Sequence, residues 1–106
     1  MKDLTKRVAI RSDAIRKAAN GEACTVCGSN DGTTVFCHLN GQWAGKGIGQ
    51  KADDIAGFFG CGTCHYEYDQ SWTKLALDHE IIMRAMYYTW RRLWELGIIS
   101  IKGEKP

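Results

Sequence analysis

The runs Cys24-Thr-Val-Cys27 and Cys61-Gly-Thr-Cys64 decide how this chain of 106 residues folds. Two residues separate the cysteines of each run, and the runs, here called the first knuckle (residues 24–27) and the second knuckle (residues 61–64), lie 33 residues apart. This short spacing lets a tight turn aim both sulfurs at one ion, and two such turns complete a tetrahedral four-sulfur site. The pattern therefore predicts structural Zn²⁺, with iron in the same geometry as the alternative.

Two other kinds of site would use the second knuckle alone. Together with His65 it has the spacing of covalent c-type haem attachment. Haem attachment normally requires export, and the first twenty residues carry six Lys or Arg and no apolar stretch typical of a secretory signal. A Cys-x-x-Cys redox pair would need a βαβ setting and would leave the first knuckle without a purpose. The fifth cysteine, Cys37, is predicted to be a small buried hydrophobic residue.

Length and composition indicate one small folded domain over residues 1–106, with a motif core at about 22–70 and a helical extension at 71–106. Apolar residues make up 44% of the chain and charged residues 25%, which is ordinary for a folded protein. No run of eighteen apolar residues exists, so we expect no membrane span. In so small a core, the free energy of metal binding would become free energy of folding.

The net charge of +2 conceals a basic–acidic–basic layout. Residues 1–20 sum to +4, residues 21–70 to −4 and residues 71–106 to +2. A negative centre attracts cations, and basic flanks suit a polyanion such as nucleic acid. The alternative is that these charges are ordinary solvated surface.

Hydrophobic patterning and turn residues predict an α+β fold. Ser12 is typical of a helix N-cap, and Gly97 of a helix stop. The expected helices are residues 13–19, a helix running on from the second knuckle to about 70, and a long amphipathic helix over 78–96; the expected strands are residues 7–11, 33–37, 55–59 and 98–102.

Two histidines occur where the expected elements would bring them together. His38 ends a predicted strand before a glycine-rich loop, and His65 follows the second knuckle at the start of a helix. Asp69 lies four residues after His65, on the same helical face. A histidine base beside a metal held by histidine and carboxylate is typical of phosphodiester hydrolysis. The alternative is a core His38 and a His65 without a role.

In order, spacing and residue type, these motifs over residues 22–70 resemble the HNH, or ββα-metal (His-Me finger), nucleases. They are especially similar to phage endonuclease VII and to small phage and prophage nuclease-like proteins. The latter share the run from His38 through Gly45-Lys-Gly-Ile-Gly-Gln-Lys-Ala-Asp-Asp54 to the second knuckle, His65 and Asp69.

The resemblance implies a zinc-stabilised ββα-metal (HNH-like) core with a short N-terminal helix and a long C-terminal amphipathic helix. It implies that His38 is the general base and that Asp54, near where the family often has asparagine, orients it. His65 would bind a catalytic divalent cation, Mg²⁺ or Mn²⁺. The position before the base, often a metal ligand in the family, is Cys37, and thiolate is a poor ligand for Mg²⁺. Either another group such as Asp69 therefore completes the metal site, or the activity is reduced.

Basic residues outside the motif are candidates for contacts with DNA phosphates. They are Lys46 and Lys51 in and after the glycine-rich loop, and Arg84 and Arg91 on the long helix. The alternatives are a purely structural turn for the loop and a solvated helix face for the arginines.

The sequence thus predicts a metal-dependent DNA endonuclease of phage or prophage type, acting in recombination or repair in the cytoplasm of a bacterial host. A homodimer is also expected, because junction-cleaving relatives often act as dimers and the long helix could serve as the interface. The alternative function is a zinc-knuckle DNA-binding or adaptor module without catalysis.

Overall fold

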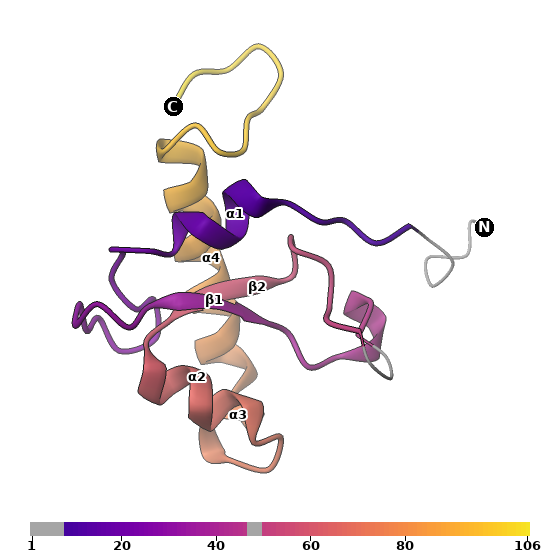
Figure 1. Cartoon of the computed structure of the whole chain (residues 1–106), viewed down its shortest axis with the longest axis vertical. Coiled ribbons are helices and arrows are strands. Elements are labelled where there is room, and N and C mark those ends of the chain that lie inside the picture. The colour runs from indigo at the N-terminus through magenta and orange to yellow at the C-terminus, as the bar shows by residue number, and fades with distance from the viewer. Residues whose placement is uncertain (1–7, 47–49) are drawn as a thin grey trace.

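A two-stranded antiparallel sheet lies at the centre of the fold (Figure 1). The computed structural model describes residues 8–46 and 50–106. Strand β1 (Val35–His38) pairs with β2 (Gly57–Gly60), so that Phe36 lies opposite Phe59 and His38 opposite Gly57. A Cβ at Gly57 would lie 2.4 Å from the carbonyl oxygen of Cys37, which is why glycine occupies this position. The two strands predicted between the knuckles therefore form, each beginning two residues later than expected.

Helices surround this sheet, and three of them match predicted helices. Asp78 caps α4, since its side chain accepts a hydrogen bond from the Ile81 N–H at 3.1 Å, and Ser12 caps α1 in the same way through Ile15. In chain order the elements are α1 (Asp13–Ala18), a 3₁₀ turn η1 (Gln42–Ala44), α2 (Gly62–Asp69), α3 (Lys74–Leu77) and α4 (His79–Glu95).

Helix α4 passes behind the sheet and extends beyond it at both ends (Figure 1). Its buried face consists of Ile82, Ala85, Thr89 and Leu93. The first two of these join a core around Phe58, whereas Leu93 joins a second core with residues of α1 and both strands. In the part of the chain that the structure describes, no helix is both long and apolar enough to cross a membrane.

The strand predicted at residues 98–102 is wrong. Gly97 adopts a φ of +74°, and the N–H groups of Ile98 and Ile99 donate to the carbonyl oxygen of Leu93. These hydrogen bonds cap the C-terminus of α4. The segment that follows does not pair with β1 or β2 and so forms no strand.

The strand predicted at residues 7–11 is also wrong over residues 8–11, and Arg7 lies outside the described residues. Ile10 bonds instead to the segment before β2: its N–H donates to the Asp53 side chain, and its carbonyl accepts from the Asp54 N–H. Isolated bonds of this kind tie two segments together without forming a sheet. The observed class is α+β, as predicted.

Candidate functional site

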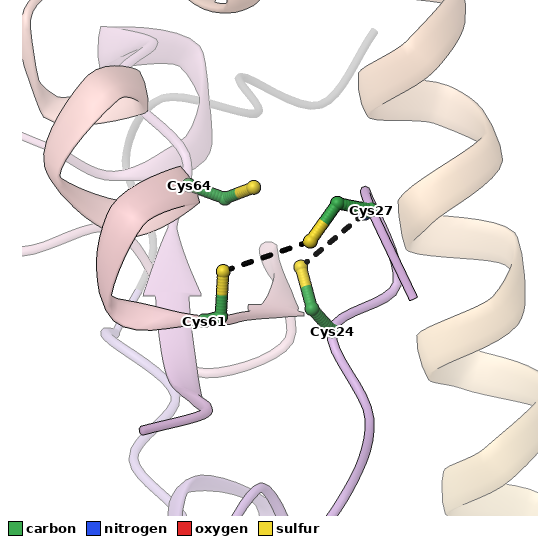
Figure 2. Close-up of side chains that lie close together, drawn as sticks. All are labelled: Cys24, Cys27, Cys61 and Cys64. Carbon is green, nitrogen blue, oxygen red and sulfur yellow. Dashed lines mark hydrogen bonds between the residues drawn. The ribbon is translucent and has the colours of Figure 1, made fainter. Parts of the chain in front are cut away.

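The four knuckle cysteines converge on one point (Figure 2). Their sulfur atoms all lie within 4.8 Å of one another, and Sγ of Cys27 lies 3.7 Å from Sγ of Cys61. A tetrahedral Zn²⁺ with Zn–S bonds of about 2.3 Å holds its sulfurs about 3.8 Å apart. The cluster Cys24, Cys27, Cys61 and Cys64 therefore fits a structural metal ion such as zinc.

The electrostatics of the cluster also favour a bound cation. Burial acts to raise the pKa of Cys24, but backbone hydrogen bonds outweigh it and lower the pKa to about 7. The N–H groups of Val26 and Cys27 lie 3.4 and 3.5 Å from Cys24 Sγ, as in a turn that presents sulfur to a metal. Burial and the neighbouring sulfurs raise the pKa of Cys64. Four thiolates this close cannot all be ionised without a compensating positive charge.

The knuckles are attached to the sheet and to α4 by hydrogen bonds. Both the N–H and the hydroxyl of Thr25 donate to the carbonyl oxygen of Phe59, at 2.8 and 2.7 Å. The hydroxyl of Thr89 on α4 accepts from the Phe59 N–H at 2.9 Å and lies 3.3 Å from the Thr25 hydroxyl. The first knuckle, β2 and α4 thus share one buried polar junction.

A second constellation lies at the end of β1. Nε2 of His38 lies 2.7 Å from Oδ1 of Asp54, and only 1% of the Asp54 side chain is exposed. The Phe36 ring packs edge-on against the imidazole at a centroid distance of 5.1 Å. His38 and Asp54, predicted together from the motif, are therefore in direct contact.

The N-terminal segment completes the surroundings of Asp54. Oδ2 accepts from the Ser12 N–H at 2.7 Å and from Nε of Arg16 at 3.0 Å, and a nitrogen of Arg11 lies 3.8 Å from Oδ1. Burial alone would raise the pKa of Asp54, but the bonds from His38 and Ser12 and the charge of Arg16 hold the pKa below its ordinary value. Asp54 is therefore an ionised acceptor at neutral pH.

The sequence analysis missed Arg11 and Arg16. Both are about forty positions from Asp54 along the chain, and no local motif links basic residues to a carboxylate at that distance. The sequence does contain a strongly basic N-terminal segment and an aspartate in the motif. Only the tertiary structure shows that the two are in contact.

His38 faces a pocket of about 430 Å³ that four other predicted site residues also line, namely His65, Asp69, Lys46 and Lys51. His65 and Asp69 are one turn apart on α2, with Nε2 of His65 3.3 Å from Oδ2 of Asp69, and both side chains are partly exposed. Lys46 also donates a hydrogen bond to Asn40. Residues 47–49 of the glycine-rich loop, with two of its glycines, lie outside the described residues.

Cys37 lies in the core, away from this pocket. Successive side chains of a strand point to opposite faces, so Cys37 points away from the face that carries His38. It is fully buried, and burial raises the pKa of its thiol to about 12. The prediction that Cys37 is a buried hydrophobic residue is confirmed.

Arg84 and Arg91 are not brought to the pocket. Arg84 lines a separate hollow beside the first knuckle, together with Tyr88. Arg91 pairs with Glu95 at 3.1 Å and lies over the Trp94 ring, 5.5 Å from its centroid. Their contact with DNA stays a prediction.

Comparisons with known proteins agree with this architecture. Residues 13–97 match the model of the family described as "Putative nuclease YbcO". Among solved structures, the chain is similar to the one titled "Structure of a putative bacteriophage protein from Escherichia coli str. K-12 substr. MG1655". The sequences are 25% identical, the match covers 79% of this chain and 100% of the other, and the TM-score is 0.57. A search of curated proteins found no match. Since the match to the family model spans most of its length, the chain belongs to the family described as "Putative nuclease YbcO".

Proposed function

We propose that this protein is a DNA endonuclease of the HNH (His-Me finger) type that depends on a divalent cation. The observation that carries the proposal is the contact of His38 with Asp54, together with the pocket that His38 shares with His65 and Asp69. Membership of a family described as nucleases supports the same class of reaction.

The hydrogen bond to Asp54 determines which nitrogen of His38 acts as the base. An ionised carboxylate can only accept hydrogen bonds. Nε2 therefore carries the proton of the imidazole and donates a hydrogen bond to Oδ1. Nδ1 then holds the free electron pair and accepts a proton from the attacking water. The oxygen of that water forms a bond to phosphorus, and the bond to the leaving oxygen of the sugar breaks. Asp54 stabilises the imidazolium that results.

His65 and Asp69 are the residues that would hold the catalytic Mg²⁺ or Mn²⁺. A cation bound there supplies positive charge that offsets the negative charge developing on the phosphate and leaving oxygen. Lys46 and Lys51, which line the same pocket, are suited to contact neighbouring phosphates of the strand.

One observation favours a second candidate, a zinc-stabilised DNA-binding or adaptor module without catalysis. Among residues 8–46 and 50–106, the knuckle cysteines are the group of three or more metal-ligating side chains placed to hold an ion. The pair His65 and Asp69 offers two protein ligands, and the remaining ligands of a catalytic cation would have to be water and phosphate oxygens.

Cleavage of plasmid DNA separates the two candidates. We expect the wild-type protein to cleave in Mg²⁺ or Mn²⁺, and both His38→Ala and His65→Ala to lose at least about 100-fold in rate. His79→Ala is the matched control, since His79 is exposed and does not line the pocket with His38. Unchanged cleavage in both site variants would contradict the site, and no cleavage by the wild-type protein in either metal would favour the module.

The proposal also covers the setting of the reaction. The likeness to a protein titled as a bacteriophage protein supports a role in phage or prophage recombination or repair in the cytoplasm of a bacterial host. A homodimer joined through the exposed side of α4 is part of the same proposal.

A further inference from the structure

The carboxylate of Asp54 connects His38 to the N-terminal segment of the chain. One oxygen faces Nε2 of His38 at 2.7 Å, and the other accepts from Nε of Arg16 at 3.0 Å and from the Ser12 N–H at 2.7 Å. The carboxylate itself is almost fully buried. His38 and the Arg16 guanidinium therefore interact through one shared group, although they do not touch each other.

Such an arrangement affects how readily His38 takes up a proton. A buried carboxylate facing an imidazole on its own stabilises the imidazolium and raises the affinity of the histidine for protons. A histidine that is already protonated cannot act as a general base. A guanidinium on the far oxygen offsets the carboxylate charge and lowers that affinity again.

We infer that Arg16 is a positioning residue for the base: through Asp54 it orients His38, and its charge offsets the negative charge of the carboxylate that the imidazole faces. The catalytic meaning of this inference rests on the proposed function, whereas the effect on His38 can be measured without DNA.

Other charged groups also face this network. Asp13 pairs with Arg16 and competes with Asp54 for its charge, and Arg11 lies near the other carboxylate oxygen. Asp53 precedes Asp54 and is buried with it. The pocket side of His38 carries the remaining charged or titratable groups, which are Lys46, Lys51, His65 and Asp69. A variant of Arg16 leaves the identity of all these residues unchanged, and the test below compares it with the loss of one positive charge elsewhere on the same helix.

The test is a titration of the His38 imidazole by NMR in Arg16→Gln, with the resonance assigned from His38→Ala. Lys17→Gln is the matched control: it removes one positive charge from the same helix, at an exposed residue with no ion pair or hydrogen bond to Asp54 in the structure. We expect Arg16→Gln to raise the midpoint by about 0.5 to 1 pH unit, a three- to tenfold gain in proton affinity. Lys17→Gln should move it by less than about 0.2 unit, and Arg16→Lys should restore most of the wild-type value. Equal midpoints in the two glutamine variants would overturn the inference.

Asp13→Asn tests the same inference if Arg16→Gln does not fold. Without the Asp13 carboxylate, the Arg16 charge is no longer shared and acts more strongly on Asp54. The midpoint of the His38 titration should therefore fall rather than rise. An unchanged or higher midpoint in folded Asp13→Asn would overturn the inference.

The pH–rate profile links the titration to cleavage. In Arg16→Gln the acidic limb of the profile should move to higher pH by the shift seen in the titration. If no protein cleaves DNA but the midpoints move as expected, the proposed function fails and the coupling of Arg16 to His38 stands. If His38 is essential for cleavage but the midpoints do not move, the proposed function stands and the coupling of Arg16 to His38 fails.

Discussion

At the scale of single residues, the hydrogen bonds and positive charge around the Asp54 carboxylate make the stability of the fold depend on pH. Hydrogen bonds and the nearby arginine hold its pKa below the ordinary value of 3.8 in the folded protein. The folded state thus binds this proton less tightly than the unfolded state does, so the contribution of Asp54 is fully present above about pH 4 and is lost as the pH falls through the lower, folded pKa.

The corresponding prediction compares the wild-type protein with Asp54→Asn. The variant keeps the shape of the side chain but loses its charge, so we expect it to be less stable by about 2 to 4 kcal/mol at pH 7. This difference should narrow when the pH is lowered below about 4. Urea unfolding at a series of pH values measures it, and a difference independent of pH would contradict the assignment of a lowered pKa.

The residues of the candidate site were predictable where a local motif carries them. Cysteine spacing identified the four-cysteine cluster that could hold a metal, and the resemblance to the HNH nucleases implied the contact between His38 and Asp54. The partners of Asp54 on the N-terminal segment were not predictable, because a guanidinium forty residues away has no fixed spacing to mark it.

At the scale of elements, Thr89 is the polar contact through which α4 holds the sheet. Its hydroxyl accepts the N–H of Phe59, a residue that is 1% exposed. Thr89→Val keeps the shape but leaves that buried N–H without a partner, which should cost about 1 to 3 kcal/mol. Thr89→Ser is the control, because it retains the hydroxyl and should recover most of this loss. Thermal and urea unfolding measure the effect, and equal destabilisation by both variants would contradict a stabilising role of the Thr89 hydroxyl.

Helices were predicted better than strands for a physical reason. The bonds of a helix are local, so the caps Ser12 and Asp78 and the stop at Gly97 mark its ends in the sequence. A strand needs a partner, and the apolar residues 98–102 have a strand-like pattern but no neighbouring edge. The pairing of β1 with β2 could be expected because the knuckles bring their ends together.

At the scale of the whole molecule, metal binding and folding should be inseparable. We expect about one tightly bound zinc per chain and a large fall in the thermal midpoint when a strong chelator removes it, because one ion would join two knuckles 33 residues apart in a domain with a small core. Cys24→Ser should impair both metal content and folding, whereas Cys37→Ala should retain the metal and lose only packing energy of about 1 to 3 kcal/mol. Elemental analysis and circular dichroism measure the two effects. A wild-type protein that is fully folded without metal would refute this prediction.

The bonds from the N-terminal segment to Asp54 bear on where the smallest autonomous unit of this fold begins. Cutting the chain back to the motif core, residues 22–70, would remove Arg11, Ser12 and Arg16 and leave His38 alone of the four partners of the Asp54 carboxylate described above. Such a fragment could keep all four sulfurs and both histidines and still lose the charge balance around them. Any transfer of this nuclease-like motif to another protein should therefore include the N-terminal segment that precedes the first cysteine.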